Sequence, residues 1–246
     1  MFNEIYAQTF QLFSIMHIIP VGIIFIIITL IYIKRDWLRD SNKETILRYS
    51  LAALIVLQEI TLQVYRLVFN TWELSTSLPL QLCAIGVMMT AVILITKSKT
   101  LFLKTVFILF IGASLALITP GIENNYGFPH FRYYQFFVSH GLIVINLSVI
   151  LFVFNFQKDI RYKHLLDNFV SLMLIAIILY IINIITGGNY MYLMEKPAPG
   201  TLFDAFGPYP IYIVQILCFG IPFFFHLFYI PFFIRDFRMS NTRQNA

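Results

Sequence analysis

The feature that most constrains this chain is a series of seven long apolar runs, which together cover most of its 246 residues. One of them contains the stretch VGIIFIIITLIYI, without a single charge. A helix needs roughly 20 residues to cross a bilayer, and lipid offers no partner to an unpaired backbone N–H or C=O. We therefore predict an all-α polytopic membrane protein with seven transmembrane helices. The predicted spans are residues 13–33, 46–69, 78–95, 101–118, 133–154, 165–185 and 209–234.

The charged residues between these runs predict how the chain is oriented. Twelve lysines and arginines follow the first, third and fifth runs or lie in the C-terminal tail, whereas the N-terminus and the other loops hold only Arg132 and Lys196. Because basic loops remain in the cytoplasm, this alternation predicts an external N-terminus and a cytoplasmic C-terminus. The longest loop has 23 residues, so residues 1–246 are expected to form one transmembrane domain.

Several functional classes find no support in the composition. The net charge of +5 comes from residues spread over short loops, so it does not indicate nucleic-acid binding. The N-terminus has no basic region followed by a cleavage site, which argues against a signal peptide. There are two cysteines, Cys83 and Cys218, and no metal-ligand spacing, so neither a metal nor a cofactor is predicted. A disulfide between these two cysteines is an open alternative.

Polar residues concentrate in the predicted outer half of the membrane. Glu59, Gln63 and Arg66 follow each other at helical spacing and share one face of the second run. Charges at this depth cost roughly 2.5–3.5 kcal/mol each and normally face the interior of a bundle. Two interpretations fit this face. It can be a structural contact bridged by Gln63, or a functional one that orients a histidine or lines a polar path.

Cys83 and His140 are the candidate catalytic pair. Counted from the predicted outer ends of their helices, Cys83 lies about 8 Å deep and His140 about 10 Å deep, so both reach a similar level. A cysteine and a histidine at one level can perform acyl transfer through a thioester, with the histidine as the base. The alternatives are that Cys83 is a small buried apolar residue and that His140 bonds to a neighbouring helix.

Other polar side chains near this level are candidates for binding a substrate. Gln81 precedes Cys83 and can donate a hydrogen bond to an oxyanion, and Arg132 can do the same. His130 and Arg132 lie in an external loop, where they either contact lipid phosphate or position a headgroup. Asn189 and Tyr190 follow the sixth run and are expected to shape the pocket. Tyr212 and Gln215 open the seventh run at a similar depth.

Three stretches carry a family resemblance: LPLQLCAIG, ITPGIENNYGFPHFRYYQFFVSHGL and GGNYMYLMEKPAPGTLFDAFGPYPIYI. They resemble the YwaF-type family of bacterial integral membrane proteins over about residues 10–235. That family is similar to a eukaryotic transmembrane acyltransferase of ether-phospholipid metabolism and, more remotely, to androgen-induced hydrolases of fatty acid esters. The resemblance implies a bacterial plasma membrane protein that transfers acyl groups without acyl-coenzyme A. It matches Cys83 and His140 to the cysteine and histidine of the acyltransferase. Many bacterial relatives have LPLHLC, where Gln81 replaces a histidine.

The sequence therefore supports three hypotheses. The first is a lipid acyltransferase, transacylase or acyl-ester hydrolase, with membrane lipids such as a phospholipid as its partners. The second is a transporter or channel-like protein, whose polar path would follow Glu59, Gln63 and Arg66. The third is a non-catalytic membrane protein. For the first, we expect a pocket lined by the second, third, fifth and seventh spans and covered by loops 119–132 and 186–208.

Overall fold

The computed structural model describes residues 9–122, 126–197 and 201–244, and these residues form helices and loops without a strand. Each of the seven predicted runs forms a helix, which confirms the all-helical class. The helices are α1 (Ile15–Leu38), α2 (Ser41–Val68), α3 (Leu82–Thr96), α4 (Lys99–Ile118), α5 (Phe131–Phe152), α6 (Lys163–Thr186), α7 (Ile211–Gln215) and α8 (Ile221–Gln244). A π-helical turn, Ile216–Gly220, joins α7 to α8, so the seventh predicted span is interrupted.

Six segments of the described chain are long and apolar enough to cross a membrane: α1, α2, α4, α5, α6 and the combined stretch Ile211–Arg238. The chain is a multi-pass helical membrane protein. By contrast, α3 has 15 residues, which gives it a length of about 22 Å against a bilayer core of about 30 Å. The seven-span count and the orientation stay predictions.

The prediction that the third helix begins at Leu78 is wrong. Residues 78–81 form a turn, and α3 begins at Leu82. Pro79 therefore lies outside the helix, although proline is common in a first helical turn. Gln81 becomes the residue that precedes the helix, and Cys83 becomes its second residue. The other boundaries differ from prediction by up to five residues, except that α8 continues ten residues beyond the predicted end at residue 234, to Gln244; most of these differences occur where polar ends continue a helix. For example, α1 extends to Leu38 and α2 begins at Ser41.

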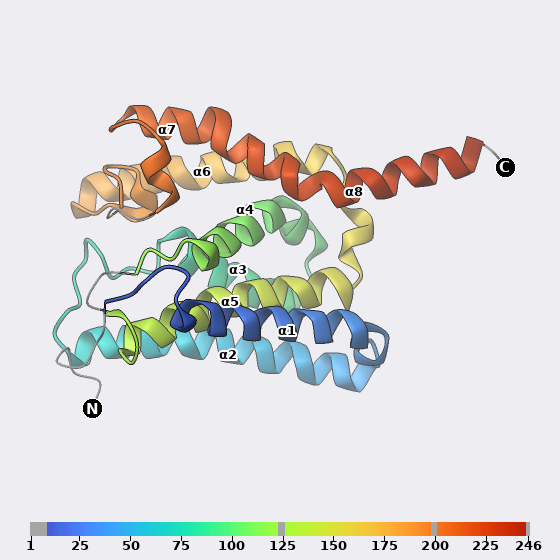
Figure 1. Cartoon of the computed structure of the whole chain (residues 1–246), viewed down its shortest axis with the longest axis horizontal. Coiled ribbons are helices and arrows are strands. Elements are labelled where there is room, and N and C mark those ends of the chain that lie inside the picture. The colour runs from blue at the N-terminus through green and yellow to red at the C-terminus, as the bar shows by residue number, and fades with distance from the viewer. Residues whose placement is uncertain (1–8, 123–125, 198–200, 245–246) are drawn as a thin grey trace.

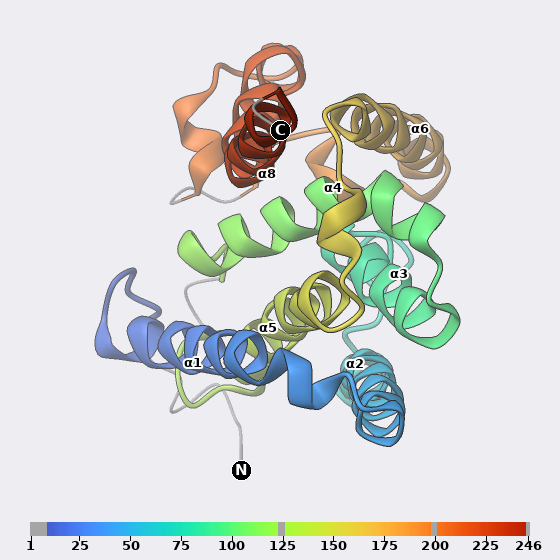
Figure 2. The ribbon, with the colours of Figure 1, turned by 90° about the vertical axis from the view of Figure 1, so that its right-hand side faces the viewer.

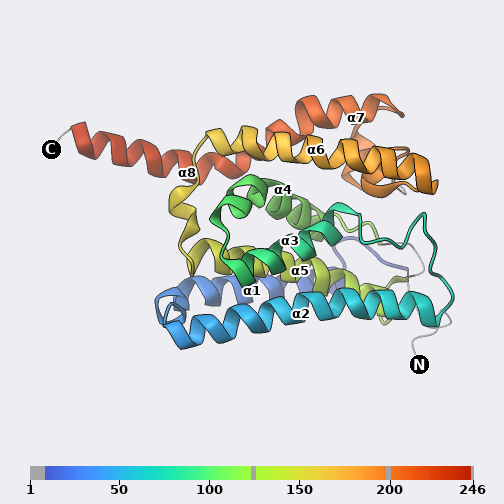
Figure 3. The same ribbon diagram turned by 180° about the vertical axis from the view of Figure 1, so that it is seen from behind.

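The helices are arranged in three tiers (Figures 1 and 3). One outer tier contains α1 and α2, the middle tier contains α3, α4 and α5, and the other outer tier contains α6, α7 and α8. Figure 2 shows α5 beside α1, with α4 between α5 and the tier of α6 and α8. The far end of α8 extends beyond the other helices (Figure 1). The middle tier is thus covered on both sides, while the outer tiers present apolar surface to lipid.

Burial follows this arrangement. Fifteen of the residues of α5 are buried, including a continuous stretch from Ser139 to Leu151. The outer helices keep large apolar side chains exposed, such as Phe25 in α1 and Ile185 in α6. A continuous buried stretch means that α5 has neighbours on all sides, so its polar residues face other helices.

Polar side chains hold the tiers together. The Oδ1 atom of Asn168 in α6 accepts from Phe107 N–H of α4 at 2.9 Å, and its Nδ2 donates to Leu103 O at 2.7 Å. His17 in α1 bonds through Nε2 to Leu117 O of α4 at 2.8 Å, and its Nδ1 accepts from Phe13 N–H at 3.0 Å. Both ring nitrogens of His17 are thus occupied. Such bonds are favoured in a medium that offers no competing water.

Candidate functional site

A cavity of about 480 Å³ lies between the middle tier and the tier of α6, α7 and α8. Its wall includes residues from α2, α3, α4, α5 and α6, from the α7–α8 segment, and from the loop after α6. Thr119 and Gly121 contribute from the other predicted loop. The expected pocket is therefore present, and α4 and α6 line it in addition to the four predicted spans. Its size lies within the usual range for small-molecule sites, about 300–1,000 Å³.

Cys83 lines this cavity from the first turn of α3. Its thiol is free and partly buried. Cys218 is also free and is exposed on the π-helical turn, so the structure holds two thiols and no disulfide between them. Because Cys83 is the second residue of its helix, it lies at the positive end of the helix dipole, where a developing negative charge is stabilised.

The first backbone amides of α3 are available to a ligand. Leu82, Cys83 and Ala84 make no N–H hydrogen bond with the residues that the structure describes; the first amide of this helix to find a partner is Ile85 N–H, which bonds to Gln81 O at 3.0 Å. The amides at a helix start point along its axis and must find partners outside the helix. All three residues line the cavity, so its wall contains a group of donors that can bind an oxyanion.

Gln81 adds a side-chain donor to this group. Its Oε1 atom accepts from Met191 N–H at 2.9 Å, which fixes the orientation of the amide. The Nε2 group makes no hydrogen bond to any part of the chain that the structure describes. Gln81 also lines the cavity. The contact to Met191 therefore leaves the NH₂ group as a donor beside the start of α3, as the sequence predicts for an oxyanion contact.

His140 lines the same cavity from α5 and has one nitrogen available. Its Nδ1 lies 2.8 Å from Phe136 O. Since a carbonyl oxygen can only accept, Nδ1 carries the proton, and Nε2 of the neutral ring is the basic atom. Nε2 has no hydrogen-bond partner in residues 9–122, 126–197 and 201–238. This arrangement differs from that of His17, whose two nitrogens are both bonded, and it is the one that a general base needs.

A row of polar side chains continues along α5 beside His140. Arg132 donates to Gln135 Oε1 at 2.6 Å, and Gln135 Nε2 lies 3.4 Å from Gln58 Oε1 of α2. Gln58 in turn donates to Ser139 Oγ at 3.3 Å. Arg132, Gln135 and Ser139 line the cavity. The sequence identified Arg132, but the participation of Gln58 and Gln135 depends on the rotation of α2 against α5.

The charged face of α2 anchors a loop. Gln63 Nε2 donates to Glu59 Oε1 and to Ser77 O, at 3.0 Å in each case. Arg66 donates to Ser77 O at 2.9 Å. Glu59 and Arg66 also line the cavity, whereas Gln63 does not. These bonds hold the turn at residues 76–77, which leads into α3, so the face helps to place Cys83.

Tyr190 and its neighbours hold the loop that covers the cavity. Tyr190 is fully buried; its hydroxyl donates to Leu74 O at 2.6 Å and accepts from Leu78 N–H at 3.2 Å. Burial raises the pKa of this hydroxyl, so it remains a neutral donor. Asn183 of α6 binds both backbone groups of Tyr190, at 2.7 and 3.0 Å. Tyr190 therefore joins the loop after α6 to the turn before α3.

The remaining predicted residues also have mainly local partners. Asn189 accepts from Met194 N–H at 2.9 Å, and Gln215 accepts from Gly207 N–H at 2.6 Å. The hydroxyl of Tyr212 donates to Tyr192 O. His130 precedes α5, and its Nδ1 accepts from Arg132 N–H at 3.1 Å. Of these four residues, Tyr212 alone lines the cavity.

No group of three or more His, Cys, Asp or Glu side chains that could hold a metal occurs among the described residues. The cavity instead combines two surfaces. Its α2, α3 and α5 side carries most of the polar groups, and its α4, α6 and α8 side is apolar. An amphipathic cavity inside a membrane protein matches a ligand that has a polar head and an apolar chain.

The fold and the cavity define a multi-pass helical membrane protein with an amphipathic cavity between its helices. Residues 10–228 match the TMEM164 family, which is a transmembrane protein family, and the chain belongs to it. A search of curated proteins and a search of solved structures each found no match. The family match covers α1 to α7 and most of the apolar part of α8, so it includes every residue of the cavity.

Proposed function

We propose that this protein is a membrane-embedded enzyme that transfers acyl groups between lipids, with Cys83 as the nucleophile and His140 as the base. The observation that supports this most is the shared cavity. Its wall includes a thiol in the first turn of α3, the three residues whose backbone amides have no partner among the described residues, and a histidine whose Nε2 has none there either. A nucleophile, a base and oxyanion donors are the groups that acyl transfer requires.

The first half of the reaction forms a thioester. His140 Nε2 takes the proton of the Cys83 thiol as the sulfur attacks the carbonyl carbon of a lipid ester. The carbonyl oxygen becomes an oxyanion, which the amides of Leu82 to Ala84 and the NH₂ group of Gln81 stabilise. The intermediate then expels the lipid alkoxide, which receives the proton from Nε2. The products are an acylated Cys83 and a lipid alcohol.

The second half returns the enzyme to its starting state. His140 Nε2 removes the proton of a hydroxyl group on a second lipid, and the oxygen attacks the thioester carbonyl. The intermediate releases the Cys83 thiolate, which recovers the proton from Nε2. Because most of the cavity wall is apolar, we expect transfer to a lipid alcohol to be favoured over hydrolysis.

The partners of this reaction are membrane lipids. The polar groups near the loops, Arg66 and Arg132, lie in the cavity wall where a phospholipid headgroup would be placed. We also propose that the site lies in the outer leaflet of a bacterial plasma membrane, which rests on the distribution of basic residues and on the resemblance to the YwaF-type family.

Mass spectrometry of the intact protein tests the thioester. The purified chain, incubated with a phospholipid of one defined acyl chain, should gain the mass of that acyl group, and neutral hydroxylamine should remove it. Cys83→Ala should abolish both the adduct and acyl transfer. The matched control is Cys218→Ala, which removes the other thiol and should retain both. Full transfer activity in Cys83→Ala would end the thioester mechanism.

A further inference from the structure

The cavity has an apolar limb that the chemical steps do not use. Beyond Cys83 its wall is formed by α4, α6 and the α7–α8 segment, with Ile108 and Ile111 from α4, Leu172 and Ala176 from α6, and Phe224 and Phe225 from α8. Each of these side chains is apolar. From Tyr212, near the loops, to Phe225 the chain advances 13 residues, which corresponds to about 20 Å along a helix.

Phe225 is the last residue of α8 in the cavity wall, and an aromatic ring of α4 packs against it. Phe225 is 4% exposed, and its ring centroid lies 5.8 Å from that of Phe107 in α4, which is fully buried. Phe228 continues the contact, with centroids 5.3 Å from Phe107 and 4.6 Å from Phe110. Aromatic rings in offset or edge-to-face contact attract each other in addition to burying apolar area.

The helices that carry these rings are also fixed in place. Asn168 joins α6 to α4 within one turn of Phe107, with bonds of 2.9 and 2.7 Å. At the same end of the bundle, Arg235 of α8 donates to Ile160 O at 2.8 Å and to Gln157 O. Because ring contacts and hydrogen bonds both hold these helices, we expect them not to move apart to admit a longer ligand.

We propose that this apolar limb binds the acyl chain of the lipid and that Phe225 determines the longest chain that fits. The inference rests on the proposed function, because the chain in the limb is the one whose carbonyl carbon would lie at Cys83. Each buried methylene contributes about 0.8 kcal/mol, or roughly a fourfold gain in affinity. Affinity should therefore rise with chain length until the chain end reaches Phe225, and then stop rising.

Binding can be measured without the reaction. The probes are saturated lysophosphatidylcholines that differ by two carbons, and the protein is the full chain with Cys83→Ala, so no thioester can form. Native mass spectrometry gives the affinity for each chain length. We expect roughly a tenfold or larger gain per two-carbon step up to a limit, followed by a plateau.

Three substitutions in this background locate the limit. Phe225→Ala should move the plateau to longer chains by at least one two-carbon step, because it removes a ring from the cavity wall. Ala176→Leu should move it to shorter chains, because it adds volume inside the limb. The matched control is Phe223→Ala, which makes the same change on a side chain that is 62% exposed on the same helix and should leave the profile unchanged.

The outcomes separate this inference from the proposed function. If Phe225→Ala does not fold, the opposite shift in Ala176→Leu still decides the question. Identical profiles in all folded variants, or no dependence on chain length, would overturn the inference even if Cys83 forms a thioester. Conversely, the absence of an acyl adduct on Cys83 in the native chain would end the acyl-transfer mechanism and leave these binding profiles as they are.

Discussion

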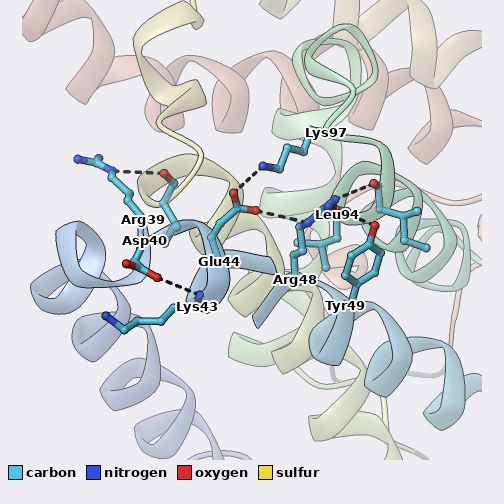
Figure 4. A network of polar contacts seen from close by, with 10 residues as sticks. Arg39, Asp40, Lys43, Glu44, Arg48, Tyr49, Leu94 and Lys97 are labelled. Atoms are coloured by element: carbon cyan, nitrogen blue, oxygen red, sulfur yellow. Dashed lines mark hydrogen bonds and ion pairs between the residues drawn. The ribbon is translucent and has the colours of Figure 1, made fainter. Parts of the chain in front are cut away.

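The two ends of α3 differ in how their backbone groups are satisfied. At the C-terminal end, Arg48 of α2 donates to Leu94 O at 3.2 Å and Ile95 O at 2.8 Å. Glu44 pairs with Arg48 at 3.5 Å and with Lys97, which ends the helix, at 2.5 Å (Figure 4). At the N-terminal end, the amides of Leu82, Cys83 and Ala84 have no partner among the described residues, and all three residues line the cavity.

In α5 the N-terminal amides are paired, since Arg132 N–H and Tyr133 N–H both bond to His130, and the group without a partner among the described residues is a side chain. The last carbonyl groups of α5 accept from Arg39, with Phe152 O at 2.8 Å and Val153 O at 3.3 Å. Nine residues from its start, His140 has an unpaired Nε2. Both helices that carry the candidate pair are thus anchored at one end by arginines from the α1–α2 region. Since capping bonds stabilise a helix, the bonds at the anchored ends offset the donors left unpaired at the cavity.

Of the variants that test this comparison, the largest effect is expected from substitution of His140, the proposed base in the cavity wall. His140→Ala should lower kcat for acyl transfer by roughly 10²–10⁴-fold, because the thiol and the acceptor hydroxyl both lose their general base. The measurement is transfer of a labelled acyl chain between phospholipids. KM should change little, since the acyl chain and headgroup contacts remain.

His226→Gln is the control for this variant. His226 lies on an exposed face of α8, outside the cavity wall, where it bonds to Tyr162 at 3.0 Å. It should keep the parent rate. If His140→Ala keeps the parent rate in a correctly folded protein, His140 is not the base, and its unpaired nitrogen needs another explanation.

A smaller effect is expected from Gln81, the side-chain donor at the start of α3. Gln81→Leu removes the NH₂ group, and kcat should fall by an amount at the lower end of the roughly 10²–10³-fold known for single oxyanion donors, because the backbone amides remain. Gln81→Glu keeps an oxygen for Met191 N–H but removes the donor, so it should also lose activity.

Gln81→His distinguishes the donor role from a purely structural one. A histidine ring N–H can donate a hydrogen bond in place of the amide. We expect substantial activity in Gln81→His and low activity in Gln81→Leu. Equal activity in all three variants would assign Gln81 to the contact with the loop alone.

Substitutions at the C-terminal end of α3, where Arg48 binds the last carbonyl groups, should have the smallest effect on catalysis and a clear effect on stability. Arg48→Met removes the donors to Leu94 O and Ile95 O and leaves Glu44 with one partner fewer, so the free energy of unfolding should fall by about 1–3 kcal/mol. Thermal unfolding in detergent measures this as a lower Tm. Activity per folded molecule should be unchanged.

Arg35→Met is the matched control for Arg48→Met. Arg35 is a peripheral arginine of α1, with Tyr32 O as its main acceptor at 2.7 Å, and its loss should change stability by less than about 1 kcal/mol. If Arg48→Met lowers kcat as strongly as Gln81→Leu does, the idea that the C-terminal end of α3 serves stability and its N-terminal end serves catalysis is wrong.

The sequence was informative about helices and less so about their ends. Hydropathy located all seven helical segments. A continuous apolar run in lipid must satisfy its backbone hydrogen bonds within itself, and the α-helix is the regular structure that does so. Hydropathy placed the start of the third helix at Leu78, whereas the structure begins it at Leu82. The bonds from Gln63 and Arg66 to Ser77, and from Tyr190 to Leu78, hold the preceding residues in a turn.

In the candidate site, too, the sequence predicted some features and not others. Chemistry and predicted depth selected Cys83, His140, Gln81 and Arg132, all of which line the cavity. The depth of Cys83 was counted from a helix start at Leu78, whereas α3 begins at Leu82 and Cys83 is its second residue. Chemistry and predicted depth did not indicate that Asn189 bonds within its own loop, that Gln215 of α7 bonds to Gly207 in the preceding loop, or that His130 accepts the Arg132 amide. The sequence did not identify Gln58, Gln135 and Asn183 as part of the site. The sequence around a side-chain amide in an apolar run does not predict which group that amide binds.

What the sequence determined by itself is the membrane class, the order of the helices and the residue types that acyl transfer needs. These follow from local properties, namely hydropathy, length and side-chain chemistry. Tertiary structure alone decided that Cys83 lies in a first helical turn whose amides have no partner among the described residues, that His140 Nε2 has none there either, and that Phe225 lies in the cavity wall against Phe107. Those features depend on the rotation of each helix about its axis and on loops that pack against distant turns, which no local pattern specifies.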